Sequence, residues 1–134
     1  LRMLRSKLVE IKEPFGHDED RLGGIDDGKR KTGSMVTSFV NAYYKKTGVP
    51  IVGVSASKGG SKIEEWQPEG VYLQDAVIRL QAAVSYLEQN GFEIRHKYML
   101  WCQGESDGDN GVTKDNYKTG LDNMIKEMMK NLLS

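Results

Sequence analysis

The stretch PIVGVSASKGGSKIEEWQP, residues 50–68, joins a short apolar run to a loop that is rich in glycine and charge. Its first seven residues, 50–56, are mostly apolar and include three β-branched side chains, which favour an extended strand. A nearly continuous apolar run of this length predicts a parallel strand that is buried on both faces of its sheet. The loop that follows then lies at the carboxyl end of the strand, where open α/β sheets bind their ligands.

The same arrangement returns at residues 97–109, KYMLWCQGESDGD, where 97–102 predict a second buried strand and the remainder a second loop. Apolar side chains that recur at intervals of three and four predict three amphipathic helices. These helices are expected over 34–47, 73–90 and 115–134. Helices that alternate with buried strands predict an α/β fold, in which a parallel sheet carries helices on both faces.

The first 33 residues differ in character from this core. Residues 1–14 predict an edge strand or an extended arm, because Pro14 cannot continue a ladder. Residues 16–33 hold five glycines and nine charged side chains, which predicts a long surface loop with almost nothing to bury. Two or three strands are few for a sheet covered on both faces, since inner strands need two neighbours. We therefore expect one incomplete domain over 1–134, with an arm and loop over 1–33 and an alternating core over 34–134.

Composition excludes several classes of protein. The chain has 19 basic and 19 acidic side chains, and this balance argues against a nucleic-acid or anionic-membrane partner. There is no run of about 18 apolar residues and no leader peptide pattern, so the sequence indicates neither a membrane span nor a compartment. Cys102 is the sole cysteine, which excludes an internal disulfide, and at the end of a buried strand it is expected to be inert. His17 stands beside three acidic residues, but an exposed charged loop fits that cluster better than a metal site.

Two ordered motifs, GGSKIEEWQP at 59–68 and WCQGESD at 101–107, resemble the carbohydrate esterase branch of the SGNH/GDSL hydrolases. That branch contains the sialate O-acetylesterases and the family-six acetylxylan esterases. Its members carry G-G-S/T-x-I-x-x-W after one strand and W-x-Q-G-E-x-D/N after the next. The resemblance covers roughly residues 33–133 and implies a flavodoxin-like three-layer α/β/α fold. It also implies a serine esterase that removes acetyl groups from sugars such as acetylxylan or sialic acid, without a metal or organic cofactor.

The resemblance implies an oxyanion hole on the two loops. Ester hydrolysis passes through a tetrahedral oxyanion, and each preorganised N–H donor stabilises it by on the order of 3 kcal/mol. The implied donors are the backbone N–H of Gly60, or alternatively of Gly59, and the side-chain amide of Gln103. Glu105 is the implied acidic residue, which orients a histidine or braces its loop. Substrate binding is expected at Ser61, Trp66 and Asp107.

Structural roles compete with the catalytic ones on the first loop and at the start of the second. The two glycines can form a tight turn that only feeds the following helix. Gln103 and Glu105 can cap or brace their loop, because polar loop side chains commonly bond the backbone.

The remaining candidate residues also have structural alternatives. Trp66 and Trp101 can serve as packing anchors, with Trp66 alternatively lining the wall of the site. Asp107, together with Ser106, can shape its loop by bonding its own backbone.

The sequence departs from the family pattern at the nucleophile and the base. The G-Q-S-N or G-D-S block that carries the serine and the D-x-x-H block that carries the histidine do not occur. The two histidines are His17 in the charged loop and His96 at the start of the second strand, opposite the expected site. A serine without a base is a weak nucleophile. We therefore expect a central portion of a longer hydrolase, inactive alone and completed by the remaining segments of the same domain.

Two functions of other classes remain open at this stage. The first is a non-catalytic module that keeps the esterase pocket and binds carbohydrate. The second is an α/β domain that binds phosphate through residues 57–61 at a helix N-terminus.

Overall fold

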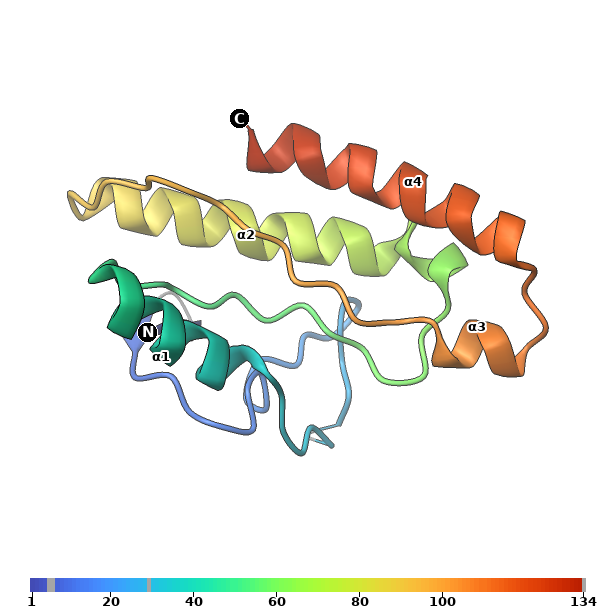
Figure 1. The fold of residues 1–134 in the computed structure, drawn as a ribbon, viewed down its shortest axis with the longest axis horizontal. Coiled ribbons are helices and arrows are strands. Elements are labelled where there is room, and N and C mark those ends of the chain that lie inside the picture. The colour runs from blue at the N-terminus through green and yellow to red at the C-terminus, as the bar shows by residue number, and fades with distance from the viewer. Residues whose placement is uncertain (5–6, 29, 134) are drawn as a thin grey trace.

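The computed structural model describes residues 1–4, 7–28 and 30–133 (Figure 1). The elements in chain order are β1 (Arg2–Leu4), β2 (Lys7–Val9), α1 (Val36–Thr47), the short 3-10 helix η1 (Ile63–Trp66), α2 (Val71–Gln89), α3 (Glu105–Asp109) and α4 (Lys114–Leu132). The three predicted amphipathic helices are confirmed as α1, α2 and α4, with ends within two residues of the predicted ones. The chain therefore mixes helices with a small sheet. None of the helices in the described ranges is long and apolar enough to cross a lipid bilayer.

The core lies where α2, α4 and η1 meet (Figure 1). Met124 and Met128 project from α4 into this core, as expected for methionines at helical spacing. Gly120 allows α4 to approach η1 closely, because a Cβ there would lie 3.0 Å from the side chain of Ile63. The buried cluster consists of Ile25, Trp66, Leu73, Ala76, Met124 and Met128. Through η1, this packing fixes the loop that follows residues 50–56.

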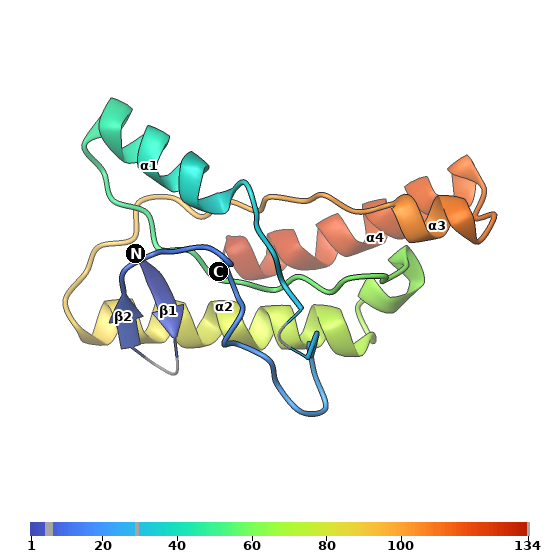
Figure 2. The ribbon, with the colours of Figure 1, turned by 90° about the horizontal axis from the view of Figure 1, so that it is seen from below.

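The predicted parallel ladder does not occur within the described residues. Residues 50–56 and 97–102, here called the first and second extended segments, run in the same direction between α1 and α2 (Figures 1 and 2). The pairing that the structure does contain is the antiparallel β1–β2 hairpin and one parallel bridge between Arg2 and Gly53. Residues 1–14, predicted to form an edge strand or an extended arm, contain this hairpin, and its strand β1 makes the bridge to the first extended segment. The extended segments form no ladder because nothing in the described chain lies between them to pair with both.

Burial of the second extended segment is also one-sided rather than two-sided. Met99 and Trp101 pack against the core, whereas Tyr98, Leu100 and Cys102 are exposed. This alternation has the period of two that is typical of a strand with one covered face. Cys102 was expected to be buried at the end of its strand, but it is exposed because none of the described residues covers that face.

The loop over residues 16–33 contributes a buried side chain to the core, contrary to the prediction that it has almost nothing to bury. Ile25 has 1% of its surface exposed and belongs to the core cluster. The carboxylate of Asp75 on α2, itself 3% exposed, accepts the backbone N–H of Ile25 at 2.8 Å. It also accepts from Arg21 at 2.8 Å and from Nε of Arg79 at 3.1 Å. Arg79 in turn donates to the carbonyl of Ser55 at 3.0 Å, so this group joins the loop, α2 and the first extended segment.

Replacing Asp75 with alanine is expected to lower the free energy of unfolding by about 3 to 5 kcal/mol, because Arg79 then loses its charge partner in a buried position. Urea unfolding followed by circular dichroism measures the change. Glu88→Ala, an exposed carboxylate on the same helix, is the control and should change stability by less than about 0.5 kcal/mol. Equal effects of the two variants would contradict the role given to Asp75.

Candidate active site

The loop that follows the first extended segment, residues 57–68, is closed on itself by hydrogen bonds. The Ser61 hydroxyl donates to the carbonyl of Lys58 at 2.9 Å and accepts the indole N–H of Trp66 at 2.9 Å. Ser61 and Trp66 are both buried. The indole of Trp66 also packs edge-on against Trp101, with ring centroids 5.4 Å apart, so both tryptophans act as packing anchors here. Contact of Ser61 or Trp66 with a substrate stays a prediction.

Gln103 joins this first loop to the second loop, residues 103–109. Its side-chain amide donates to the carbonyl of Ser61 at 2.7 Å and to the carboxylate of Asp107 at 2.6 Å. The Tyr117 hydroxyl, from α4, lies 2.7 Å from the Gln103 carbonyl and 3.1 Å from its Oε1. Both hydrogens of the Gln103 amide nitrogen are therefore directed at oxygen atoms of the protein. The two loops converge, as the position of both motifs at the carboxyl ends of neighbouring extended segments predicts.

Asp107 adds a second tie between the loops. Its carboxylate is buried and accepts the backbone N–H of Ile63, the first residue of η1, at 3.0 Å. The predicted bond of this side chain to its own loop backbone is wrong, because its partners are Ile63 and Gln103. The carboxylate also lies at the N-terminal end of η1, where negative charge is favoured. A contact between Asp107 and substrate stays a prediction.

The two glycines of the first loop differ in the use of their backbone N–H groups. The N–H of Gly59 donates to Oδ1 of Asp27 at 3.1 Å. No hydrogen bond among the described residues involves the N–H of Gly60. Gly60 has a φ of +71°, and a Cβ added there would meet no atom within 4 Å. Of the two glycines, Gly60 is therefore the one whose N–H makes no hydrogen bond among the described residues, and its role as an oxyanion donor stays a prediction.

A group of charged side chains surrounds the Gly59 amide. The carboxylate of Asp27 pairs with the ammonium groups of Lys31 and Lys58, the latter at 3.1 Å. Burial by itself would raise the pKa of Asp27. The hydrogen bonds from Lys31, Lys58 and the Gly59 N–H outweigh burial and hold that pKa below its ordinary value. Asp27 is therefore ionised at neutral pH.

Glu105, the other predicted catalytic residue, begins the five-residue helix α3 and is exposed. It lies at the edge of the same cavity as Gln103. Within the described chain, no hydrogen bond or ion pair joins Glu105 to a histidine. His96 lies at the start of the second extended segment beside Tyr98, with ring centroids 6.0 Å apart, whereas Gln103 follows its end. His17 is half-buried in the loop after β2 rather than exposed, and the described residues hold no cluster of three or more His, Cys, Asp or Glu that suits a metal ion.

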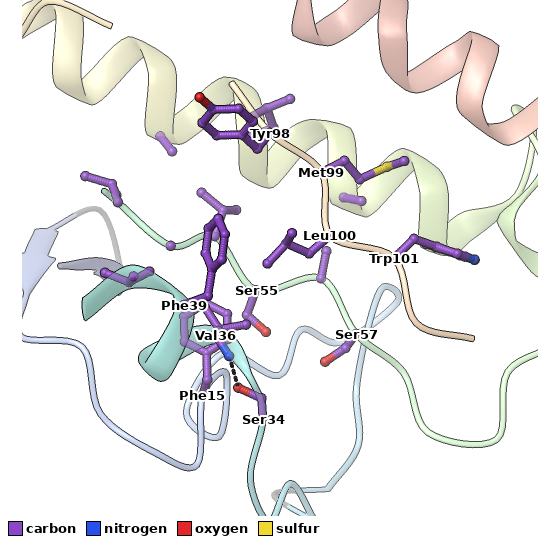
Figure 3. A pocket seen from close by; sticks show the side chains of 18 of the residues that line it. Phe15, Ser34, Val36, Phe39, Ser55, Ser57, Tyr98, Met99, Leu100 and Trp101 are labelled. Carbon is purple, nitrogen blue, oxygen red and sulfur yellow. Dashed lines mark hydrogen bonds between the residues drawn. The ribbon is translucent and has the colours of Figure 1, made fainter. Parts of the chain in front are cut away.

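A cavity of about 1560 Å³ lies between the two extended segments and reaches both loops. Figure 3 shows its apolar walls, with Phe39 of α1 on one side and Met99 and Leu100 of the second extended segment on the other. Pockets for small ligands usually measure about 300 to 1,000 Å³. This space is therefore larger than a small molecule needs, and its walls are largely apolar, as in the interior of a protein.

Sequence reasoning missed two residues that organise the loops. Tyr117 lies outside both motifs, and the helical pattern of residues 115–134 gives no sign that its hydroxyl reaches Gln103. Asp27 lies in a charged loop, and none of its neighbours in the sequence marks it as a site residue. Two of its partners, Lys58 and Gly59, follow more than 25 residues later.

Comparison with known proteins gives one family match. The family described as carbohydrate esterase, sialic acid-specific acetylesterase, matches residues 3–134, which is nearly the whole chain. The chain matches no curated protein and no solved structure.

A double-mutant cycle tests the tie between the loops. Gln103→Ala and Asp107→Ala should each destabilise the fold, and the double variant should lose at least about 1 kcal/mol less than the sum, because the residues share a hydrogen bond. The free energies come from urea unfolding. Pairing Gln103→Ala with Asp109→Ala, an exposed carboxylate of the same helix, should give additive losses. Additivity in both cycles would contradict the Gln103–Asp107 contact.

The lowered pKa of Asp27 predicts a dependence of stability on pH. A carboxyl whose pKa is lower in the folded than in the unfolded state stabilises the fold above its unfolded pKa, and this contribution disappears as pH falls through the folded value. The unfolding free energy of the wild type should exceed that of Asp27→Asn at about pH 7, and the difference should shrink below about pH 4. Asp26→Asn, an exposed neighbour, is the control. A difference that stays constant down to about pH 2 would refute the prediction.

Proposed function

This chain belongs to the carbohydrate esterase family of sialic acid-specific acetylesterases, and from that membership we propose that it forms the oxyanion-binding part of a sugar O-acetylesterase. The observation that carries the proposal is the 2.7 Å bond from the Gln103 amide to the carbonyl of Ser61, next to Gly60. This bond supports a site in which a backbone donor from one loop and a side-chain donor from the other stand close together.

The chemistry assigned to the site is acyl transfer to a serine. When the serine oxygen attacks the acetyl carbonyl, negative charge develops on the carbonyl oxygen, and N–H groups already directed at that position lower the barrier. We assign these donors to the free N–H of Gly60 and to the amide of Gln103, which must turn one hydrogen away from Ser61 or Asp107. Glu105 orients the histidine that takes the serine proton. The substrate is an acetylated sugar, for example acetylxylan or an O-acetylated sialic acid, and the reaction needs no metal or organic cofactor.

The serine and histidine are assigned to the remaining segments of the same domain. The first extended segment supports this assignment through its alternating hydrogen bonds: Gly53 exchanges bonds with Leu1 and Met3 at 2.9 and 3.2 Å. Among the described residues, the backbone groups of Val52 and Val54 make no hydrogen bond, and they alternate with Gly53 along the strand. These groups belong to the edge of the segment that has no partner among the described residues.

We propose that one further strand fills the space between the two extended segments and completes a parallel sheet with helices on both faces. The cavity of about 1560 Å³ supports this arrangement, since it runs along both segments and its walls are largely apolar. A strand placed there ends beside the two loops. Its last residue then lies near Gly60 and Gln103, where the serine is needed.

The isolated chain is proposed to be inactive. His96 lies at the opposite end of its extended segment from Gln103, and no bond links His17 to either loop within the described residues. Without a base, no serine of this chain is activated for attack on an ester.

Replacing Gln103 with alanine in the intact hydrolase should lower kcat for an acetylated sugar about a hundredfold, because one oxyanion donor is lost. Released acetate measures the rate. Gln81→Ala, on the exposed side of α2, is the matched control and should leave kcat unchanged. An unchanged kcat in the Gln103 variant would refute its role. Binding of the acetylated sugar by the intact wild type without any release of acetate would instead favour the carbohydrate-binding module.

A further inference from the structure

We propose that Asp27 is a positioning residue for the oxyanion site, because its carboxylate holds the Gly59 N–H and thereby directs the Gly60 N–H toward the reacting acyl group. The inference rests on the proposed esterase function and adds to it a residue from outside both sequence motifs.

Several contacts hold the Asp27 loop against the glycine turn. Asp27 Oδ1 and Oδ2 lie 3.1 and 3.4 Å from the Gly59 nitrogen. The ammonium of Lys31 donates to the carbonyl of Ser57 at 2.9 Å, and that of Lys58 donates to the carbonyl of Asp26 at 2.7 Å. Each loop therefore donates a hydrogen bond to the backbone of the other, in addition to the bond between Asp27 and Gly59.

Asp27 is itself held in place. Its backbone N–H donates to the carboxylate of Asp20 at 2.9 Å, and its side chain is only 12% exposed. An acceptor with a fixed backbone and a covered side chain can fix the group that donates to it. This distinguishes Asp27 from Asp26, whose exposed carboxylate accepts the nearby N–H of Gly28 at 2.8 Å.

A pair of glycines needs such an external support. Glycine has more backbone conformations than any other residue, and Gly60 adopts a positive φ. An oxyanion donor acts only at a defined position, and a displacement of about 1 Å can lower a rate about a hundredfold. The bond to Asp27 restrains the Lys58–Gly59 peptide, which lies one peptide before the one that carries the Gly60 N–H. Among the described residues, no hydrogen bond involves the Gly60 N–H, so it remains available to a ligand.

The charges around Asp27 suit an anionic intermediate. A lone carboxylate beside an oxyanion would raise the energy of that oxyanion. Here Lys31 and Lys58 both pair with the carboxylate, so the three groups together carry one positive charge at neutral pH. Asp27 can thus accept from Gly59 without adding net negative charge beside the glycine turn.

A competing interpretation is that Asp27 blocks the site by occupying a donor that the oxyanion needs. The two interpretations predict opposite effects of removing the carboxylate. If Asp27 positions the turn, its removal slows the reaction; if Asp27 occupies the oxyanion position, its removal accelerates the reaction.

The test uses the intact hydrolase with Asp27→Ala and Asp27→Asn, acetylated sugar as substrate, and rates expressed per active site titrated with a fluorophosphonate. We expect Asp27→Ala to lower kcat about ten- to a hundredfold with KM changed less than twofold. Asp27→Asn keeps an oxygen acceptor for Gly59 and should recover a substantial part of kcat. Active-site titration removes any contribution of unfolded protein, and Asp26→Ala is the matched control in the same loop.

The outcomes separate the inference from the function it rests on. Acetate release by the wild type is required by the proposed function, and its absence would overturn function and inference together. With an active wild type, an unchanged or increased kcat in Asp27→Ala overturns the inference alone. A fall in kcat that Asp27→Asn does not relieve, or a rise in KM without a change in kcat, also overturns it, because neither follows from positioning of the Gly60 N–H.

Discussion

The tie between the two loops is the interaction on which the site depends. The Asp107 carboxylate accepts from Ile63 of the first loop and from Gln103 of the second, while Gln103 also reaches the carbonyl of Ser61. These groups are buried or partly buried, where an unmade hydrogen bond costs about 1 to 3 kcal/mol, so the loss of one member leaves its partners unsatisfied at that cost. The two loops therefore keep a fixed mutual position although no sheet ladder joins the segments before them.

The space between the extended segments has the opposite character. The N-terminal residues pair with the first segment on one edge, and the core covers one face of the second. The facing edges and the apolar walls of the cavity have no partner in the described chain. Gly60 and Gln103 both line this cavity, and the bond from Gln103 to the carbonyl of Ser61 places them where the two loops converge.

The sequence predicted the features that depend on neighbouring residues and missed those that depend on residues far apart in the chain. The helices followed from local periodicity, and α1 ends at Gly48, which adopts a φ of +71° and donates its N–H to the carbonyl of Tyr44. The strands did not, because a strand depends on neighbours that local sequence does not describe. Leu22 and Ile25 illustrate the same limit: both are aliphatic residues of one loop, yet Leu22 is 96% exposed and Ile25 is 1% exposed. The carboxylate of Asp75, fifty residues later in the chain, accepts the backbone N–H of Ile25 and holds this residue in the core.

The sequence alone determined the amphipathic helices, the two motif loops and the family, since each depends on residue types at short spacing. It left open whether Gly59 or Gly60 offers its N–H to a ligand. Only the tertiary structure distinguishes the two N–H groups, because Asp27, 32 residues before Gly59, accepts from Gly59, whereas no hydrogen bond among the described residues involves the N–H of Gly60. Which donor stays free depends on which acceptor folding brings beside it, and that acceptor lies in a segment whose sequence shows no relation to the turn.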